Sequence, residues 1–213
     1  MDLDLQKLRR IESGMVPEEI LQRAVAVLDA GGLLVIPTET VYGLAGDLSI
    51  PGVLESIYRA KGRPESKPIP LFAADAAQVE ADGAELGPGA RALARRFWPG
   101  PLTMVLKTPA GFKGYRVPDD PVSMALLKRA GRILGVTSAN RSGEPPATDA
   151  EAAFEALGAF VGLALDAGPS RGGVPSVVAK VEGSKVEILR EGAIPGQMIK
   201  DVFQEAQKAA GGG

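Results

Sequence analysis

The amino-acid sequence predicts an α/β protein with a three-layer, twisted, open, mixed β-sheet and helices on both faces. Apolar runs of strand length alternate with amphipathic segments of helical period along most of the chain. Two adjacent strands near the C-terminus are joined by a short polar turn, which favours an antiparallel pair. The 213 residues fit one domain, 1–213, with a core at about 17–192 and a C-terminal helix and glycine tail at 195–213.

The first part of the chain predicts two helices on either side of a buried strand. A proline in the first turn, two glutamates and an apolar stripe predict a helix over 17–30. The apolar run 33–36 is a buried strand that leads directly into the polar turn 37–40. Ser49 is the expected N-cap of the next helix, which ends in a cationic loop that begins at Lys61.

The rest of the chain alternates in the same way. Short polar side chains at Asp75, Asp120 and Thr148 are expected to open helices. The last two strands are joined through 182–185 as a hairpin. The other predicted helices span 89–97, 120–128, 148–157 and 195–209, and the predicted strands are 69–73, 102–107, a short segment with Arg116 and Val117, 133–137, 163–166, 176–181 and 186–190.

Composition excludes several kinds of chemistry. The chain has no cysteine and no histidine, so disulfides, thiolate or histidine metal sites and Ser-His-Asp catalysis are excluded. Carboxylates, hydroxyls, amides and cations remain. Lys and Arg total 24 against 26 Asp and Glu, and the pI is near 5.4, so the chain lacks the basic balance of a protein that coats nucleic acid unselectively.

The sequence also predicts where the protein works. The first ten residues mix acidic and basic side chains without an apolar core, so we expect no signal peptide. No apolar run approaches the ~18 residues of a membrane span. We therefore expect a cytoplasmic protein that does not associate with membranes.

A cationic loop is the first candidate binding element. Lys61, Arg63 and Lys67 fall close together, and Gly62 and Pro64 favour a loop that brings the three cations round one polyanion. Neither a G-x-x-x-x-G-K-[ST] loop nor a G-x-G-x-x-G turn after a strand occurs, so any phosphate site is built differently. A solvated surface turn explains the same charges, and spacing alone leaves both interpretations open.

Polar residues follow two of the predicted strands. Ser138 and Asn140 stand where a buried strand ends, which is where open α/β sheets hold ligands, although such residues also form ordinary turns. Thr38, Glu39 and Thr40 follow the first buried strand. They are either a capped turn or a site of hydroxyls and a carboxylate for a small polar ligand.

Two arginines lie at or near strand ends. Arg116 and Arg190 each suit a carboxylate or phosphate bound through two N–H groups, or a surface ion pair worth roughly 0–1 kcal/mol. Together with the three cations of the loop, they exceed what structure requires. They suit a ligand with several negative charges, such as a nucleoside triphosphate with a carboxylate.

Seven motifs, taken in order, resemble one protein family. They extend from Ile36 to Gly192 and occur in the order found in YrdC-like L-threonylcarbamoyladenylate synthases, in the short, single-domain form of that family. The motifs are IPTETVYGLAGD, KGRPESKP, FWPGPLT, RVPDDP, TSANRSGEPPAT, VPSVV and ILREG.

The resemblance implies a YrdC-like fold and a nucleotidyltransferase. Such an enzyme forms threonylcarbamoyl-AMP and pyrophosphate from L-threonine, bicarbonate and ATP, with Mg²⁺. Partner proteins would then transfer the threonylcarbamoyl group to adenosine-37 of transfer RNA, the t6A modification. Positioning and charge neutralisation suffice for this chemistry, which suits a chain without histidine.

The matched motifs also imply roles for single residues. Arg116 would bind the threonine carboxylate. Phe72 and Phe112 depart from the pattern, because some members carry histidine at the first position and a small hydroxyl residue usually occupies the second, where it would contact ATP. The implied catalytic residues are Lys61 and Arg63, the implied threonine site is Thr40, Arg116 and Ser176, and the implied ATP site is Lys61, Arg63, Lys67, Ser138, Asn140 and Arg190, with no metal ligand implied.

Three other functions fit parts of this pattern. The same positive cleft would serve a module that binds double-stranded RNA or transfer RNA, or that assists ribosome maturation, and its affinity would fall steeply with salt. A diverged relative would use another amino acid. A related domain of hydrogenase-maturation proteins transfers a different carbamoyl group, but those proteins carry zinc-finger cysteines that this chain lacks.

Overall fold

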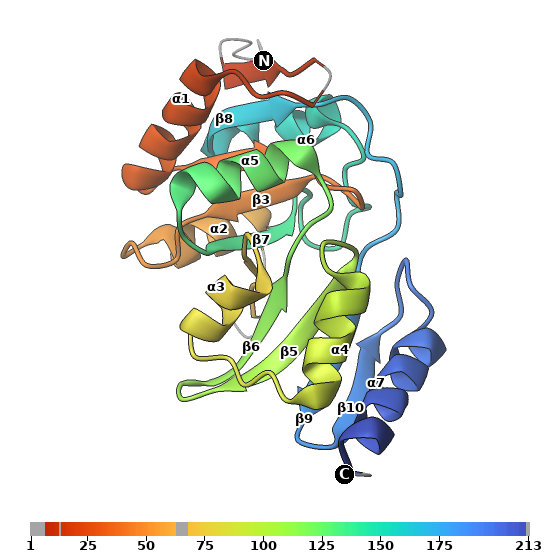
Figure 1. Ribbon diagram of the computed structural model, residues 1–213. Helices are drawn as coiled ribbons and strands as arrows, with labels where there is room; N and C mark the ends of the chain where they lie inside the picture. Colours follow the sequence, from red (N-terminus) through yellow and green to blue (C-terminus); the bar gives the residue numbers. More distant parts are fainter. Residues whose placement is uncertain (1–6, 13, 63–67, 212–213) are drawn as a thin grey trace.

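The structure is a computed structural model that describes residues 7–12, 14–62 and 68–211 (Figure 1). Within these residues the strands form one ten-stranded mixed sheet in the order β1-β8-β2-β3-β7-β4-β6-β5-β9-β10. The elements are β1 (Leu8–Arg10), α1 (Glu18–Asp29), β2 (Leu33–Ile36), β3 (Gly43–Gly46), α2 (Val53–Lys61), β4 (Leu71–Phe72), α3 (Ala76–Ala81), α4 (Pro88–Phe97), β5 (Leu102–Thr108), β6 (Gly111–Arg116), α5 (Pro121–Ala130), β7 (Leu134–Ser138), α6 (Ala150–Leu157), the 3-10 turn η2 (Gly158–Phe160), β8 (Val161–Asp166), β9 (Val177–Glu182), β10 (Lys185–Arg190) and α7 (Gly196–Gly211).

The sheet mixes parallel and antiparallel pairs, as predicted. β9 and β10 form the expected antiparallel hairpin, with Glu182 opposite Lys185. β5 and β6 form a second hairpin. The sequence pattern predicts β5, but of β6 it predicts only the end near Arg116, since β6 begins at Gly111. Parallel pairs join β1 and β2 to β8, β4 to β6, and β5 to β9.

The sequence pattern does not predict β1 or β3. β3 has the sequence GLAG, and glycine is a poor strand former. Both of its glycines are required by packing, because a Cβ at Gly43 would lie 2.8 Å from a methyl of Val136, and one at Gly46 would lie 2.7 Å from a methyl of Val53. The strand therefore exists because its neighbours pack closely on it, which local propensity cannot show.

Two predicted helix caps are wrong by one to a few residues. The N-cap of α2 is Gly52, and Ser49 instead donates from its backbone N–H (2.9 Å) and hydroxyl (2.6 Å) to the carboxylate of Asp47. The N-cap of α6 is Asp149 and not Thr148, because the Asp149 carboxylate accepts a backbone N–H of the first turn at 2.8 Å. The other two predicted caps are confirmed.

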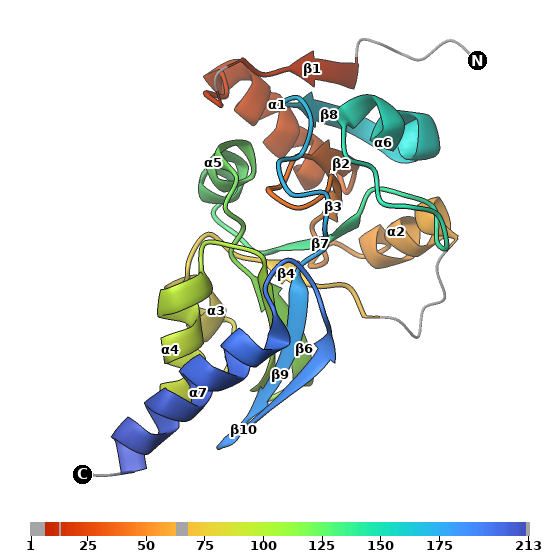
Figure 2. The ribbon, with the colours of Figure 1, turned by 90° about the vertical axis from the view of Figure 1, so that its right-hand side faces the viewer.

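The helices cover the two halves of the sheet differently (Figure 2). Around β2, β3 and β8, α1 and α5 pack on one face and α2 and α6 on the other, so the predicted layers are confirmed there. Around β5, β6 and β9, a core with α3, α4 and α7 covers one face. In the described part of the chain no helix covers the second face of these strands, and the candidate site lies on it.

A helix with the length and hydropathy needed to cross a membrane does not occur among the described residues.

Candidate active site

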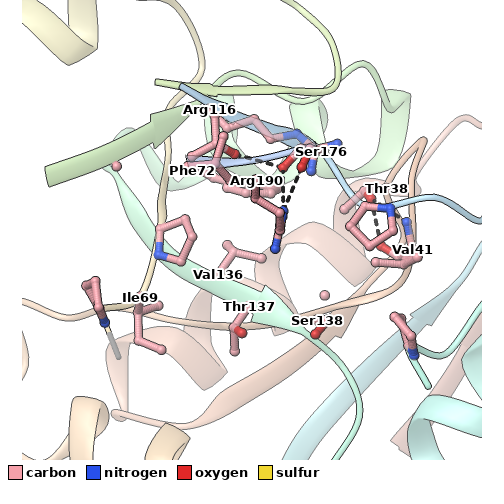
Figure 3. Close-up of a pocket in the computed structure, with 18 of the residues that line it drawn as sticks. Thr38, Val41, Ile69, Phe72, Arg116, Val136, Thr137, Ser138, Ser176 and Arg190 are labelled. Atoms are coloured by element: carbon pink, nitrogen blue, oxygen red, sulfur yellow. Dashed lines mark hydrogen bonds between the residues drawn. The ribbon is translucent and has the colours of Figure 1, made fainter. Parts of the chain in front are cut away.

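A cavity of about 570 Å³ opens on the uncovered face of β5, β6 and β9, next to the turn after β2 and the end of β7 (Figure 3). Its size lies within the range of small-molecule sites. Its polar lining is Thr38, Thr103, Arg116, Thr137, Ser138, Asn140, Glu144, Ser176 and Arg190, and its apolar lining includes Val41, Ile69, Phe72, Val105, Phe112, Val136, Val178 and Leu189.

Strand alternation explains why polar side chains reach this cavity. On β5, Leu102 and Met104 lie in the core, while Thr103 between them faces the opposite side and lines the cavity. On β6, Tyr115 lies in the same core and Arg116 faces the cavity. The uncovered face therefore carries hydroxyls and a guanidinium on a rigid sheet.

Arg116 is buried and held from several sides. Its Nη2 lies 2.7 Å from a carboxylate oxygen of Glu39 and donates to Oγ1 of Thr40 at 3.0 Å. Its Nε donates to the carbonyl of Gly100 at 3.3 Å, and the guanidinium lies over the ring of Phe72 at 5.2 Å from the centroid. A guanidinium in a fixed plane at a cavity wall suits two-point binding of a carboxylate.

Ser176 joins Arg190 to the same wall (Figure 3). Nη2 of Arg190 donates to the carbonyl of Ser176 at 2.7 Å and to its hydroxyl at 3.3 Å. The Ser176 hydroxyl also lies 2.9 Å from the hydroxyl of Thr103 on β5. The structure thus brings Arg116, Ser176 and Arg190 to one cavity, although they lie far apart in sequence.

Lys61 lies behind the cavity wall. It is 3% exposed and ends α2. Its ammonium donates to the carbonyl of Asn140 at 2.6 Å and to the carbonyl of Ser138. Lys61 therefore fixes the end of β7, whose two polar residues line the cavity, and its contact with phosphate remains a prediction.

Two of the predicted phosphate-binding residues, Arg63 and Lys67, lie outside the described residues. Asn140 donates from its side-chain amide to the carbonyls of Arg141 (2.8 Å) and Glu144 (2.7 Å), which leaves Oδ1 buried without a hydrogen-bond partner among the described residues. The fold therefore leaves one buried acceptor of this residue unsatisfied.

The turn after β2 forms the neighbouring wall. Thr38 Oγ1 donates to the carbonyl of Val41 at 2.7 Å and lies 2.9 Å from the hydroxyl of Thr40. Thr38 lines the cavity, whereas Thr40 lies behind it against Arg116. The interpretation of this segment as a capped turn therefore holds, and its role in binding threonine remains a prediction.

Sequence reasoning misses part of the lining. Thr103 carries a signal, because it stands alone between two apolar residues of a predicted strand and so faces away from the core. Phe112 is 41% exposed, and Leu189 is exposed as well. The resemblance already implies that position 112 contacts ATP, whereas the place of Leu189 in the cavity depends on the pairing of β9 and β10, for which the sequence carries no local signal.

Asp120 is the N-cap of α5, and the fold shifts its pKa. Its Oδ1 accepts the backbone N–H groups of Val122 (3.0 Å) and Ser123 (2.9 Å). Burial raises the pKa of Asp120 above its ordinary 3.8, the two N–H bonds oppose the shift, and the charge of Glu39 adds to it. The folded state then holds the proton more tightly than the unfolded state. This group therefore favours the fold increasingly as pH falls through the raised pKa toward 3.8.

Replacing Asp120 by asparagine is expected to change the pH dependence of stability. Asparagine keeps a capping oxygen but does not titrate, so urea unfolding should give free energies within about 1 kcal/mol of each other at neutral pH. As the pH is lowered, the parent should gain stability relative to Asp120→Asn. If the free energy of unfolding of the unmodified protein instead falls relative to that of Asp120→Asn as the pH is lowered, the pKa of Asp120 is not raised.

Comparisons with known proteins identify the family. The model of the family Sua5_yciO_yrdC, described as telomere recombination, matches residues 26–192. The chain belongs to this family. A relative from Mycobacterium tuberculosis is 35% identical to this Sua5_yciO_yrdC member over 190 residues, which cover 84% of this chain and 87% of the relative.

Longer members of the Sua5_yciO_yrdC family also match. Threonylcarbamoyl-AMP synthase of Bacillus subtilis is 34% identical over 194 residues, which cover 86% of this chain and 56% of that protein. The crystal structure of Pyrococcus abyssi Sua5 complexed with L-threonine is 31% identical, has a TM-score of 0.84, and is matched over 92% of this chain and 59% of that one. The chain thus spans somewhat over half of these two relatives and most of the mycobacterial one.

Phe72 and Phe112, the two residues that the resemblance marks as departures, both line the cavity. Phe72 lies under the Arg116 guanidinium, where the ring provides a cation–π contact. Phe112 lies under the ammonium of Lys180, 4.0 Å from the ring centroid. The structure therefore gives each ring a cationic partner, Arg116 in the cavity wall for Phe72 and Lys180 on β9 for Phe112.

Proposed function

We propose that the chain is a threonylcarbamoyl-AMP synthase, a nucleotidyltransferase that uses L-threonine, bicarbonate and ATP in the cytoplasm. The observation that carries the proposal is the fixed guanidinium of Arg116, which shares one cavity with Ser176, Arg190 and the polar end of β7. Relatives named threonylcarbamoyl-AMP synthase, and a solved relative complexed with L-threonine, support it.

In the proposed reaction the neutral amine of threonine adds to carbon dioxide derived from bicarbonate and gives a carbamate. A carbamate oxygen then attacks the α-phosphorus of ATP. The bond from that phosphorus to its bridging oxygen breaks, and pyrophosphate leaves. Reactions of this kind gain most from orientation, which contributes up to roughly 7–11 kcal/mol when reacting groups are held in place.

The residues of the chain would hold the reactants. Arg116 would bind the carboxylate of threonine, with Thr40 and Ser176 beside it. Ser138, Asn140 and Arg190 would contact the nucleotide. Lys61, Arg63 and Lys67 would neutralise phosphate charge, with Lys61 also holding the end of β7.

We propose that Mg²⁺ enters together with ATP. Among the described residues, no three acidic side chains lie close enough to form a metal site of their own. Mg²⁺ usually binds through one or two carboxylates together with substrate phosphates, and Glu144 is the carboxylate of the cavity wall that would contact it. The ion would supply charge neutralisation at the phosphates.

The product would pass to partner proteins that transfer the threonylcarbamoyl group to adenosine-37 of transfer RNA. A module that only binds transfer RNA or double-stranded RNA through the same cleft is the weaker interpretation. The named relatives favour the synthase, and an acidic pI near 5.4 does not favour an RNA-coating surface. A synthase of this kind could also bind RNA weakly, so weak RNA binding alone does not distinguish the two functions.

Pyrophosphate release from ATP and bicarbonate tests the proposal. We expect release to depend on L-threonine and to be roughly 10-fold or more slower with L-serine, which lacks one methyl group. Assays without amino acid and without added bicarbonate are the controls. No threonine-dependent release, together with RNA binding that weakens steeply as salt increases, would favour the RNA-binding module instead.

A further inference from the structure

Glu39 and Arg116 form a buried ion pair at the edge of the cavity. Glu39 Oε1 lies 2.7 Å from Arg116 Nη2, and the two side chains are 11% and 6% exposed. Arg116 lines the cavity, whereas both carboxylate oxygens of Glu39 are buried away from it. The pair is therefore one-sided, with the carboxylate behind the guanidinium and the cavity in front.

Stability alone does not explain a carboxylate at this position. Neither carboxylate oxygen of Glu39 forms a hydrogen bond among the described residues, so its contact with Arg116 is an ion pair only, and buried oxygens without a hydrogen bond disfavour folding. The charge of Glu39 also raises the pKa of Asp120, so the two carboxylates repel each other. Buried ion pairs often stabilise a fold less than apolar residues of similar volume. A buried group with these contacts points to a role in function.

The backbone fixes where the Glu39 side chain starts. The carbonyl of Glu39 accepts the N–H of Gly172 at 3.0 Å, and a Cβ at that glycine would lie only 2.7 Å from the same oxygen. On the other side, the Ser123 hydroxyl donates to the carbonyl of Pro37 at 2.5 Å. The turn is thus anchored without the ion pair. The side chain of Arg116, which is longer and more flexible, meets the carboxylate of this anchored turn with its guanidinium.

The guanidinium has donors left for a ligand. Nε is directed to the carbonyl of Gly100, and Nη2 is shared between Glu39 and the Thr40 hydroxyl. Within the part of the chain that the structure describes, Nη1 forms no hydrogen bond. Two-point binding of a carboxylate requires the plane of the guanidinium to be fixed.

We propose that Glu39 is a positioning residue, which fixes the plane of the Arg116 guanidinium so that its remaining N–H groups meet the carboxylate of the amino-acid substrate. This inference rests on the proposed function and extends it to a residue that does not itself touch the substrate. If Glu39 has this role, the KM for threonine depends on whether the side chain at position 39 has an oxygen that faces Arg116.

Glu39→Met and Glu39→Gln form a matched pair for the test. Both keep the volume of the side chain, but only glutamine keeps an oxygen that accepts from the guanidinium. In the pyrophosphate assay we expect Glu39→Met to raise the KM for L-threonine about 10-fold or more, and Glu39→Gln about threefold or less. The KM for ATP should stay within about threefold in both variants.

Several results would overturn the positioning role. They are an unchanged KM for threonine in Glu39→Met, a glutamine variant no better than methionine, or equal increases in the KM for threonine and for ATP. Glu39→Asp carries the test where the methionine variant does not fold, because it keeps the charge but shortens the reach. We expect it to raise the KM for threonine, and a parent-like value would overturn the proposal.

Controls separate this inference from the proposed function. Glu19→Met, on the exposed face of α1, should behave as the parent does. Calorimetric titration with L-threonine alone should repeat the order of affinities without any reaction. If the unmodified protein shows no threonine-dependent release of pyrophosphate, the proposed function is refuted. If it shows such release and Glu39→Met has the same KM for threonine, only the role of Glu39 is refuted.

Discussion

Replacing Lys61 by methionine is expected to reduce kcat/KM for pyrophosphate release on the order of 100-fold or more, equivalent to about 2.7 kcal/mol. The Lys61 ammonium is buried and donates to the carbonyls of Ser138 and Asn140. Methionine fills a similar volume but donates no hydrogen bond, so the end of β7 loses the group that fixes it. A phosphate contact of Lys61 would be lost as well.

A neighbouring cation on the same helix gives the matched control. Arg59 is exposed on α2, and its guanidinium donates to the Ser56 hydroxyl at 3.2 Å on the surface of that helix. Arg59→Met should keep kcat/KM within about twofold of the parent. Thermal unfolding checks that Lys61→Met is folded at the assay temperature. A folded Lys61→Met with parental kcat/KM would show that neither its carbonyl contacts nor its charge serves catalysis.

Local pattern predicts the elements of this fold better than it predicts their ends. The strands with apolar runs and the helices with periodic stripes are predicted because each carries its own signal. β3 is not, because its two glycines reflect close packing on Val136 and Val53, which come from other elements. The cap of α2 is mispredicted for a different reason. Ser49 donates to the carboxylate of Asp47, two residues before it, and this local turn contact competes with a capping role.

The candidate site shows the same division. Polar residues at strand ends, such as Ser138 and Thr38, can be proposed from sequence because strand ends commonly face ligands. The sequence predicts Lys61 as one of three cations in a loop. In the structure it is the last residue of α2 and lies buried against backbone carbonyls. That burial depends on how α2 packs beside the end of β7. Charge spacing along the chain carries no information on it.

The pairing of Glu39 with Arg116 cannot be predicted from the sequence pattern. The two residues stand on different elements, and only the pairing of β4 with β6 and β7, and of β3 with β2 and β7, brings them together. From sequence alone, Arg116 is either a binding residue or part of a surface ion pair, and Glu39 belongs either to a capped turn or to a site for a small polar ligand. The structure adds that the two side chains form a buried ion pair, which changes the substitution that best tests the site.

Arg116→Lys is expected to raise the KM for L-threonine on the order of 100-fold, with a smaller change in the KM for ATP. Lysine keeps the positive charge but lacks the planar fork, so it cannot contact Glu39, Thr40 and a carboxylate in one fixed plane. A loss of about 2.7 kcal/mol corresponds to this change in affinity. The pyrophosphate assay over a range of threonine concentrations measures it.

The size of this effect separates charge from geometry. If the site required only a positive charge near the substrate carboxylate, Arg116→Lys would bind threonine almost as the parent does. Lys113→Arg makes the reverse exchange on the same strand, at an exposed residue paired with Asp82 at 3.0 Å, and should leave both KM values within about twofold. A parental threonine KM in a folded Arg116→Lys would therefore remove the fixed guanidinium plane from the proposed mechanism, and with it the reason for a buried carboxylate at Glu39.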